Sequence, residues 1–239
     1  AAAGRRVLLV DMDPQGNATM GMGIDKNALE VTGGDLLMGN APFADCVVHL
    51  EEPAQGLDLL PSNGDMTAAE VGLMQSARRE RALADALAGV SDAYEIVIVD
   101  CPPSLNMLTV NALVAADGVL IPIQCEYYAL EGLSALLETI EQIRDSRNSH
   151  LRIEGILRTM HDPRNNLANQ VSTQLVTHFT NEVYRTIIPR NVRLAEAPSH
   201  GLPALLYDRS SRGSIAYQAL ASEVLRRRER RAEPQPSAA

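Results

Sequence analysis

Short apolar runs alternate with longer polar and amphipathic segments along this chain. Five of the runs are rich in Val, Ile or Leu without polar alternation, which is typical of buried parallel strands. They cover residues 7–10, 57–60, 96–99, 119–123 and 153–157. The segments between and after them predict helices over residues 67–90, 129–147, 167–179 and 214–231. The first of these helices opens with a capping-box pattern formed by Thr67 and Glu70 and stops at Gly89.

Strands that alternate with helices predict βαβ units and an α/β fold, a doubly wound, mostly parallel sheet with helices on both faces. With 239 residues, 46% of them hydrophobic, we expect one domain over residues 1–231 and a disordered tail over 232–239. In the last helix, we expect a core-facing stripe of Ile215, Ala219, Leu220 and Val224. The arginine-rich end of that helix, residues 226–231, favours the helix dipole, with a DNA or membrane role as the alternative.

Composition narrows the cellular setting. No run of 18 apolar residues predicts a membrane-spanning helix, and no signal-peptide pattern is visible. The three cysteines are scattered, which fits a reducing cytosol. A net charge of −9 repels nucleic acid, so any DNA binding needs a local cluster of positive charge. Lys26 is the only lysine among the 21 basic residues, and arginine is the better bidentate phosphate binder.

Acidic residues stand at the ends of two predicted strands. Asp11 and Asp13 end the run "RRVLLVDMDPQGN", and Asp100 ends "YEIVIVD", followed by two prolines. The carboxyl edge of an open α/β sheet is where ligands bind, and a hydrophobic strand ending in Asp is typical of a Walker B magnesium site. Three carboxylates at one edge repel one another unless a cation lies among them. The sequence therefore predicts the metal side of a nucleotide site, although one such Asp alone is also typical of a turn or helix cap.

The phosphate side of such a site is not evident. A Gly-rich loop of the type G-x-x-x-x-G-K-[ST] normally supplies backbone N–H groups and a lysine. The segment "GMGIDKN" contains glycines and Lys26, but its spacing is wrong and no Ser or Thr follows the lysine. The opening "AAAGRR" is typical of the end of a helix with a Gly cap. We therefore expect that the printed chain lacks its true beginning.

Four long motifs resemble the ParA/Soj family of partitioning ATPases, which belongs to the deviant-Walker-A group of P-loop ATPases. These motifs are "RVLLVDMDPQGNAT", "YEIVIVDCPPSLNMLTVNAL", "IPIQCEYYALEGLSALLETI" and the segment from "TIIPRNVRLAEAPSHG" to "ASEVL". The resemblance runs from residue 1 to about residue 225. It implies a strand and a K-G-G-V-G-K-T-T loop ahead of "AAAGRR". About 25 residues of the family pattern are therefore expected before residue 1.

The resemblance also implies roles for individual residues. Asp13 matches the aspartate needed for hydrolysis, which helps to position the attacking water or the metal shell, and Asp11 supports the Mg²⁺ region. Asp100 matches the Walker B aspartate. The switch segment, residues 101–103, matches the part that responds to the γ-phosphate, and Pro102 lies in it. The remaining matches are an adenine pocket at Met160, Asp162, Pro189 and Asn191, and basic positions for sequence-independent DNA binding at Arg164 and Arg193.

Taken together, the resemblance implies an ATPase that uses ATP and Mg²⁺, forms an ATP-dependent homodimer, binds DNA nonspecifically and segregates a chromosome or plasmid with a ParB-type DNA-binding partner. Such a protein is cytoplasmic and nucleoid-associated, without a membrane partner. The alternatives are a MinD-like membrane-associated regulator and a non-catalytic fragment that keeps the fold without a phosphate loop. The missing strand of the family fold lies beside residues 96–99. We therefore expect the printed chain alone to be insoluble or to bind no ATP.

Overall fold

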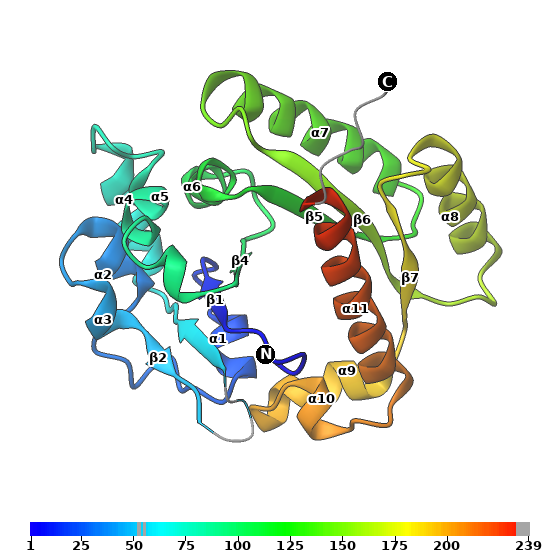
Figure 1. Ribbon diagram of the computed structural model, residues 1–239, viewed down its shortest axis with the longest axis horizontal. Coiled ribbons are helices and arrows are strands. Elements are labelled where there is room, and N and C mark those ends of the chain that lie inside the picture. The colour runs from blue at the N-terminus through cyan, green and yellow to red at the C-terminus, as the bar shows by residue number, and fades with distance from the viewer. Residues whose placement is uncertain (52–53, 55, 233–239) are drawn as a thin grey trace.

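The computed structural model describes residues 1–51, 54 and 56–232, and its strands form two sheets (Figure 1). In the first sheet the strand order is β2-β3-β1-β4. The strands β1 (Val7–Asp11), β3 (Leu57–Leu60) and β4 (Ile96–Asp100) are parallel to one another. The two-residue strand β2 (Val48–His49) is antiparallel to β3. The second sheet has the order β5-β6-β7 and is entirely parallel, with β5 (Gly118–Gln124), β6 (Arg152–His161) and β7 (Val183–Pro189). The mostly parallel α/β fold is confirmed, and β2 and β7 are strands that the hydrophobic pattern did not predict.

Helices follow most strands along the chain. The three longest are α7 (Ala129–Ser146), α8 (Asn166–His178) and α11 (Arg212–Ala232), close to the predicted ranges. The shorter ones are α1 (Asn17–Gly21), α2 (Gly33–Met38), α3 (Phe43–Cys46), α4 (Met66–Met74), α5 (Ala82–Leu87), α6 (Met107–Ala115), α9 (Val192–Glu196) and α10 (Ala204–Tyr207), with 3₁₀ turns η1 (Ser91–Ala93) and η2 (Ala197–His200).

The second sheet is covered on both faces. Ile156 of β6 packs in a cluster with residues of α7 and α8, such as Ile140 and Leu175. Leu157, the next residue on the same strand, packs with Leu220 of α11. Because successive side chains of a strand point to opposite faces, α7 and α8 lie on one side of this sheet and α11 on the other, as Figure 1 shows. This is the doubly wound arrangement that the sequence predicted.

A separate core supports the first sheet. Leu8 and Val10 of β1 are fully buried and pack with apolar residues of α2, α4, α5 and α6. These contacts fix β1 between β3 and β4, with five residues of β1 in register with β4. The carboxyl end of β1 therefore lies beside that of β4.

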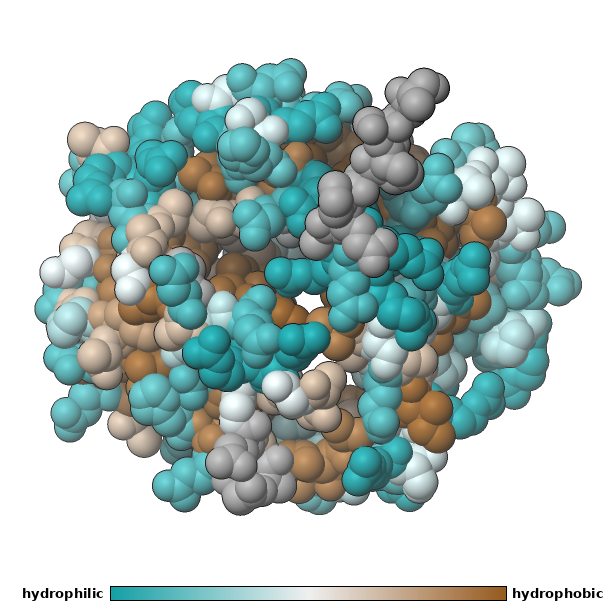
Figure 2. Space-filling model, viewed as in Figure 1, coloured by the Kyte–Doolittle hydropathy of each residue, from teal (hydrophilic) through white to brown (hydrophobic). Residues whose placement is uncertain are grey.

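An opening separates the two sheets. β4 is bonded to β1 and β5 to β6, and these two strands are sheet edges that leave Ile98 52% and Leu120 37% exposed. Figure 2 shows the molecule hollowed at the middle of this view, with hydrophobic residues on the floor of the hollow. At the amino ends of the strands, a cavity of about 580 Å³ is lined by residues of both sheets and of α11. The family strand expected beside residues 96–99 stays a prediction.

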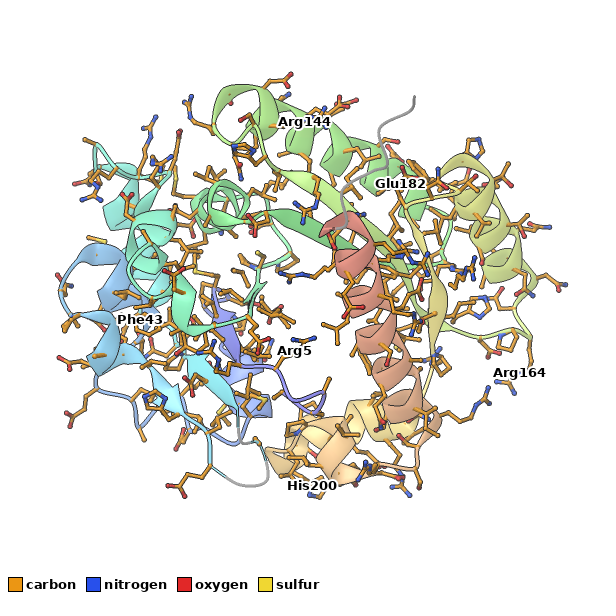
Figure 3. The ribbon with its side chains drawn as sticks, in the orientation of Figure 1. Arg5, Phe43, Arg144, Arg164, Glu182 and His200 are labelled. Carbon is orange, nitrogen blue, oxygen red and sulfur yellow. The ribbon has the colours of Figure 1, made fainter. Side chains whose placement is uncertain are left out.

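Two long side-chain contacts tie the halves of the molecule together. Arg5, at the start of β1, pairs with Glu95 at 2.8 Å and reaches Glu229 of α11 at 3.9 Å; it points toward α11 in Figure 3. Asn148, after α7, donates to the carbonyl oxygens of Leu113 and Ala116 at the end of α6. Within the described residues, no helix is both long enough and apolar enough to cross a bilayer.

Two predicted helical features are wrong. The helix predicted over residues 67–90 is split into α4 and α5, and Thr67 and Glu70 form no capping box, because the residue at the N-cap of α4 is Asp65 and makes no side-chain cap bond. In the predicted stripe of α11, Leu220 and Val224 face the core, whereas Ala219 is exposed and Ile215 is 56% exposed.

The two ends of the chain also bear on the predictions. At the start, residues 1–4 form a turn in which the Gly4 N–H donates to the Ala1 carbonyl at 2.7 Å, and the helix end expected from "AAAGRR" stays a prediction. Gly4 does have the positive φ of 74° that a C-cap glycine has. The tail predicted over 232–239 lies outside the described residues, apart from Ala232 at the end of α11.

Candidate functional site

The two predicted acidic strand ends lie side by side. Asp11 of β1 is the register partner of Asp100 of β4, and the Met12 N–H donates to the Asp100 carbonyl at 2.8 Å. Neighbouring strands are about 4.8 Å apart, so the two side chains start from adjacent positions at the carboxyl edge. This edge is where open α/β sheets bind ligands.

The Asp11 carboxylate is held by hydrogen bonds from nearby residues of its own chain. It is fully buried, and its carboxylate accepts hydrogen bonds from the N–H and hydroxyl of Thr19, at 2.8 and 2.7 Å, and from the Asp13 N–H at 3.1 Å. Burial raises the pKa of Asp11, whereas the bonds from Thr19 oppose that rise. Asp11 therefore fixes the start of α1 to the end of β1, and its role toward a cofactor stays a prediction.

Asp13 begins a tight turn, residues 13–16, which we call the Asp13 turn. One carboxylate oxygen, Oδ1, accepts from the Gln15 N–H at 2.9 Å, and the Asp13 carbonyl accepts from the Gly16 N–H at 2.9 Å. The hydroxyl of Ser62, which is fully buried just after β3, donates to the same carbonyl at 2.8 Å. Within the described residues, no hydrogen bond reaches the second oxygen, Oδ2, which is left for a ligand.

Asp100 carries the most perturbed carboxylate of this edge. Although the residue as a whole is exposed, burial of its carboxyl group, together with the negative charges of Asp11 and Asp13, raises its pKa to about 6. No hydrogen bond from the described part of the chain reaches its carboxylate. The half-buried thiol of the next residue, Cys101, has its pKa raised to about 11 by burial and by the charge of Asp100. A cation at Asp100 relieves both the burial cost and the repulsion.

The chemistry of these donors fits Mg²⁺. This ion prefers carboxylate oxygens and is usually held by one or two of them, with water and substrate phosphates as its other ligands. Asp100 and Asp13 have oxygens that could serve as such ligands. Within the described ranges, no group of three or more His, Cys, Asp and Glu side chains is arranged to hold a metal. Asp13 and Asp100 as the metal ligands, and Asp11 as a residue that supports the Mg²⁺ region, stay predictions; the Asp11 carboxylate is already engaged by Thr19.

The switch segment joins Asp100 to α6. Pro102 is buried and Pro103 is exposed. The far end of the linker is fixed at the N-terminus of α6, where Asn106 accepts from the Thr109 N–H at 3.1 Å. Glu70 of α4 adds a second restraint, since its carboxylate accepts from the Asn106 side chain at 3.2 Å and from the backbone of the next residue at 3.3 Å. Sequence reasoning had placed Glu70 in a capping box and missed this contact.

A second pocket lies at the carboxyl ends of β5, β6 and β7. It has a volume of about 220 Å³ and is lined by Gln124, Cys125, Glu126, Met160, Asp162, Asn165, Ala168 and Arg190. Two of the four predicted adenine-pocket residues, Met160 and Asp162, therefore line it. Pro189 and Asn191 flank the lining residue Arg190, and Asn191 caps α9 by accepting from the Arg193 N–H at 3.0 Å. Met160 has a positive φ of 50°, which is uncommon for a non-glycine residue and is a kind of backbone strain that clusters at functional sites.

The two arginines predicted to bind DNA lie on separate elements, and both are ion-paired. Arg164, in the loop between β6 and α8, projects from the periphery of the molecule (Figure 3), where its side chain is 88% exposed and makes two bonds to Asp162, at 2.8 and 3.0 Å. This pairing lowers the pKa of Asp162. Arg193 of α9 pairs with Glu196 at 2.8 Å and with Asp208 at 3.5 Å. A phosphate that binds here competes with these carboxylates.

Sequence reasoning missed the residues that hold the acidic edge in place. Thr19, Ser62 and Lys26 bond to this edge or to the Asp13 turn, and Glu70 restrains the far end of the switch segment at α6. Ser62 had a local signal for this role, because it is a polar residue just after a predicted strand, whereas the sequence pattern assigned Glu70 to a capping box and gave Lys26 no function. The other three are recognisable only from tertiary contacts.

Comparison with known proteins identifies the family. The AAA_31 family, described as "AAA domain", matches residues 1–153. The chain is 51% identical to the chromosome partitioning protein ParA of Caulobacter vibrioides, over 97% of this chain and 87% of that protein. It is 50% identical to the sporulation initiation inhibitor protein Soj of Bacillus subtilis, over 94% and 88%.

A solved structure agrees with this family. The cobyrinic acid a,c-diamide synthase of Mycobacterium smegmatis, with bound ADP and magnesium, has a TM-score of 0.83 to this chain and is 35% identical to it. The match covers 100% of this chain and 89% of that one. The family resemblance read from the motifs is thus confirmed, and the chain belongs to the ParA/Soj family of chromosome-partitioning P-loop ATPases.

Proposed function

We propose that this protein is a ParA-type ATPase that hydrolyses Mg²⁺-bound ATP at the carboxyl edge of β1 and β4. The observation that carries this proposal is the meeting of two acidic strand ends: Asp11 pairs in register with Asp100, and burial of the Asp100 carboxyl, with the charges of Asp11 and Asp13 nearby, raises its pKa to about 6. Phosphoryl transfer needs positioning and charge neutralisation more than covalent chemistry; this edge would supply the first through Asp13 and the second through the magnesium that its carboxylates would hold.

Each residue of the edge has a separate task. Asp100 and Asp13 hold the magnesium, which when bound neutralises the charge that develops on the phosphates. Asp13 also orients the attacking water, and Asp11 keeps the chain around Asp13 in place through Thr19. The pocket of about 220 Å³ at Met160 and Asp162 takes the adenine base. The resemblance implies a K-G-G-V-G-K-T-T loop as the source of the phosphate donors.

The proposed cycle couples this site to DNA. ATP joins two subunits, and only the dimer presents enough arginines, including Arg164 and Arg193, to hold a DNA backbone. A ParB-type partner stimulates hydrolysis, the dimer separates, and the cargo DNA is segregated. With a net charge of −9, the chain cannot attract DNA as a whole, so these local arginines provide the attraction.

A DNA-binding assay tests the coupling. Fluorescence anisotropy of a labelled duplex should show that the full-length gene product binds DNA with ATP and Mg²⁺, independently of sequence and with an affinity that falls steeply with salt. Replacing Arg164 or Arg193 by Ala should weaken binding and reduce the salt dependence, whereas the exposed Arg81→Ala variant on α5's N-cap should not. Sequence-specific binding, or binding unaffected by either substitution, contradicts the proposal.

The same protein distinguishes the alternatives. A MinD-like regulator binds anionic lipid vesicles in the presence of ATP, and a ParA-type protein does not. A non-catalytic member of the fold neither hydrolyses ATP nor responds to Asp13→Ala. Near the end of α11, Arg227 and Arg231 are already paired with Glu223 and Glu154, which supports the expectation that the protein does not bind lipid.

A further inference from the structure

Lys26, the only lysine of the printed chain, folds back over the Asp13 turn. Its ammonium group donates to the carbonyl oxygen of Gln15, inside the turn. Its aliphatic part lies over Gly16, because a side chain built at Gly16 would meet the Lys26 Cδ atom at 2.9 Å. The sequence pattern gave this lysine no function, and its spacing excluded it from a phosphate loop.

Ser62 contacts the same turn from the other side. Its hydroxyl donates to the Asp13 carbonyl at 2.8 Å, and its own carbonyl oxygen would lie only 2.6 Å from a Cβ atom at Gly16. Gly16 has a positive φ of 60°, so glycine suits both the backbone conformation and the narrow space between Ser62 and Lys26. The turn is therefore enclosed by one residue from each side.

A clamp of this kind has a clear physical purpose. Asp11 and Asp100 lie close enough to Asp13 for their charges to interact, and like charges push the Asp13 carboxylate away from the edge. In the described residues, no basic side chain forms an ion pair with any of these three carboxylates. The backbone of the turn must then hold Asp13 in place, and its carbonyls are held by Lys26 and Ser62.

We propose that Lys26 and Ser62 are positioning residues that clamp the Asp13 turn and so set the place of the Asp13 carboxylate during hydrolysis. The inference rests on the proposed ATPase function. Neither residue touches the reacting atoms; both act through the backbone carbonyls of the turn. Displacing a catalytic group by about 1 Å can cost roughly 100-fold in rate, so the loss of a clamp acts on turnover more than on nucleotide binding.

The test compares Lys26→Met, which keeps the aliphatic stem and removes the ammonium, with Lys26→Arg, which keeps a donor. In the full-length gene product, Lys26→Met should lower kcat roughly 10- to 100-fold while the Kd for ATP changes by less than about twofold. Lys26→Arg should retain most of the activity. Ser62→Ala should lower kcat in the same way, and the matched control Arg226→Met, an exposed cation on α11, should have no effect.

Hydrogen–deuterium exchange of the peptide that contains residues 13–16 provides a readout independent of activity. Lys26→Met should speed exchange there roughly tenfold, through loss of a charge-assisted hydrogen bond, and Lys26→Arg should not. Unchanged exchange in Lys26→Met overturns the clamp. Faster exchange with unchanged kcat overturns the positioning role. A wild-type protein that does not hydrolyse ATP contradicts the proposed function and with it the catalytic role of the clamp, while the exchange measurement still decides whether the clamp exists.

Discussion

Thr19 holds the acidic edge together, and its hydroxyl can be removed without changing the shape of the side chain. The residue is fully buried; its hydroxyl donates to Asp11 at 2.7 Å and accepts from the Ser62 N–H at 3.0 Å. Thr19→Val replaces this hydroxyl by a methyl group of nearly the same volume. The substitution therefore removes two hydrogen bonds and leaves no cavity.

The expected loss can be worked out bond by bond. A hydrogen bond to a charged group contributes about 1.5–3 kcal/mol, and a buried N–H left without a partner costs about 1–3 kcal/mol. Because Asp11 keeps two backbone donors, from Thr19 and Asp13, we take the lower part of both ranges, about 3 kcal/mol in total. For a chain of this length, that lowers Tm by roughly 6–12 °C.

Thermal and urea unfolding of the full-length gene product measure this loss. Thr109→Val is a matched control, because Thr109 is also buried and its hydroxyl makes a 2.7 Å bond to the uncharged Ser104 carbonyl, so its loss should cost only about 1 kcal/mol. Thr19→Ser keeps both bonds and should stay within about 1.5 kcal/mol of the wild type. If Thr19→Val and Thr109→Val destabilise the protein equally, the structural role given to the Asp11–Thr19–Ser62 network is refuted.

Three further predictions concern the charge of the edge, the packing of β6 and the printed chain. Because the folded pKa of Asp100 is raised to about 6, its carboxyl group makes the native state bind protons more tightly, so the free energy of unfolding should fall as pH rises from about 4 to about 6. Asp100→Asn should reduce this fall in a series of Tm measurements, and identical pH profiles would contradict the shift. Gly155→Ala would drive a Cβ atom into the Tyr184 ring and to 2.8 Å from the Glu182 carbonyl oxygen, and should lower stability by about 1–3 kcal/mol in urea unfolding; an unchanged midpoint would mean that β6 and β7 are not packed this tightly. The printed 239 residues alone should show no thermal stabilisation at low micromolar ATP, and a clear rise in Tm there would overturn that expectation.

The hydrophobic pattern predicted those parts of the fold that depend on burial alone. All five predicted strands exist, because each is a short run dominated by Val, Ile and Leu, the residues that sheet packing favours. It missed β7, in which Arg185 and Thr186 interrupt the apolar run. The structure accommodates this polar pair because Glu223 of α11 accepts hydrogen bonds from both backbone N–H groups. Glu223 also explains why the apolar stripe predicted for α11 is partly wrong: this polar residue is buried and takes a core-facing position of the helix.

Tertiary contacts explain why the predicted helix over residues 67–90 is broken. Asn111 of α6 donates to the Arg79 carbonyl at 2.5 Å and accepts from the Leu83 N–H at 3.2 Å. These bonds take up backbone groups that a continuous helix would use internally. Nothing in the local sequence signals a partner 28 or more residues away.

In the candidate site, too, the features set by local sequence were predictable and those set by tertiary contacts were not. The acidic residues were predictable because a buried strand that ends in Asp is a local pattern, and β1 and β4 do bring Asp11 and Asp100 together. Which of the carboxylates is available to a ligand was not predictable, because it depends on Thr19, eight residues along the chain and fully buried against Asp11.

The central claim, that Asp13 and Asp100 form the magnesium and water-positioning end of an ATPase site, is tested most directly by magnesium-dependent ATP turnover of the full-length gene product. Asp13→Asn and Asp100→Asn should each lower kcat by roughly 100-fold or more, since each removes a group on which charge neutralisation or positioning depends. Asp117→Asn, at an exposed aspartate beside the amino end of β5, should match the wild type. If the Asp13 and Asp100 variants turn over ATP as fast as the Asp117 variant does, the account is contradicted.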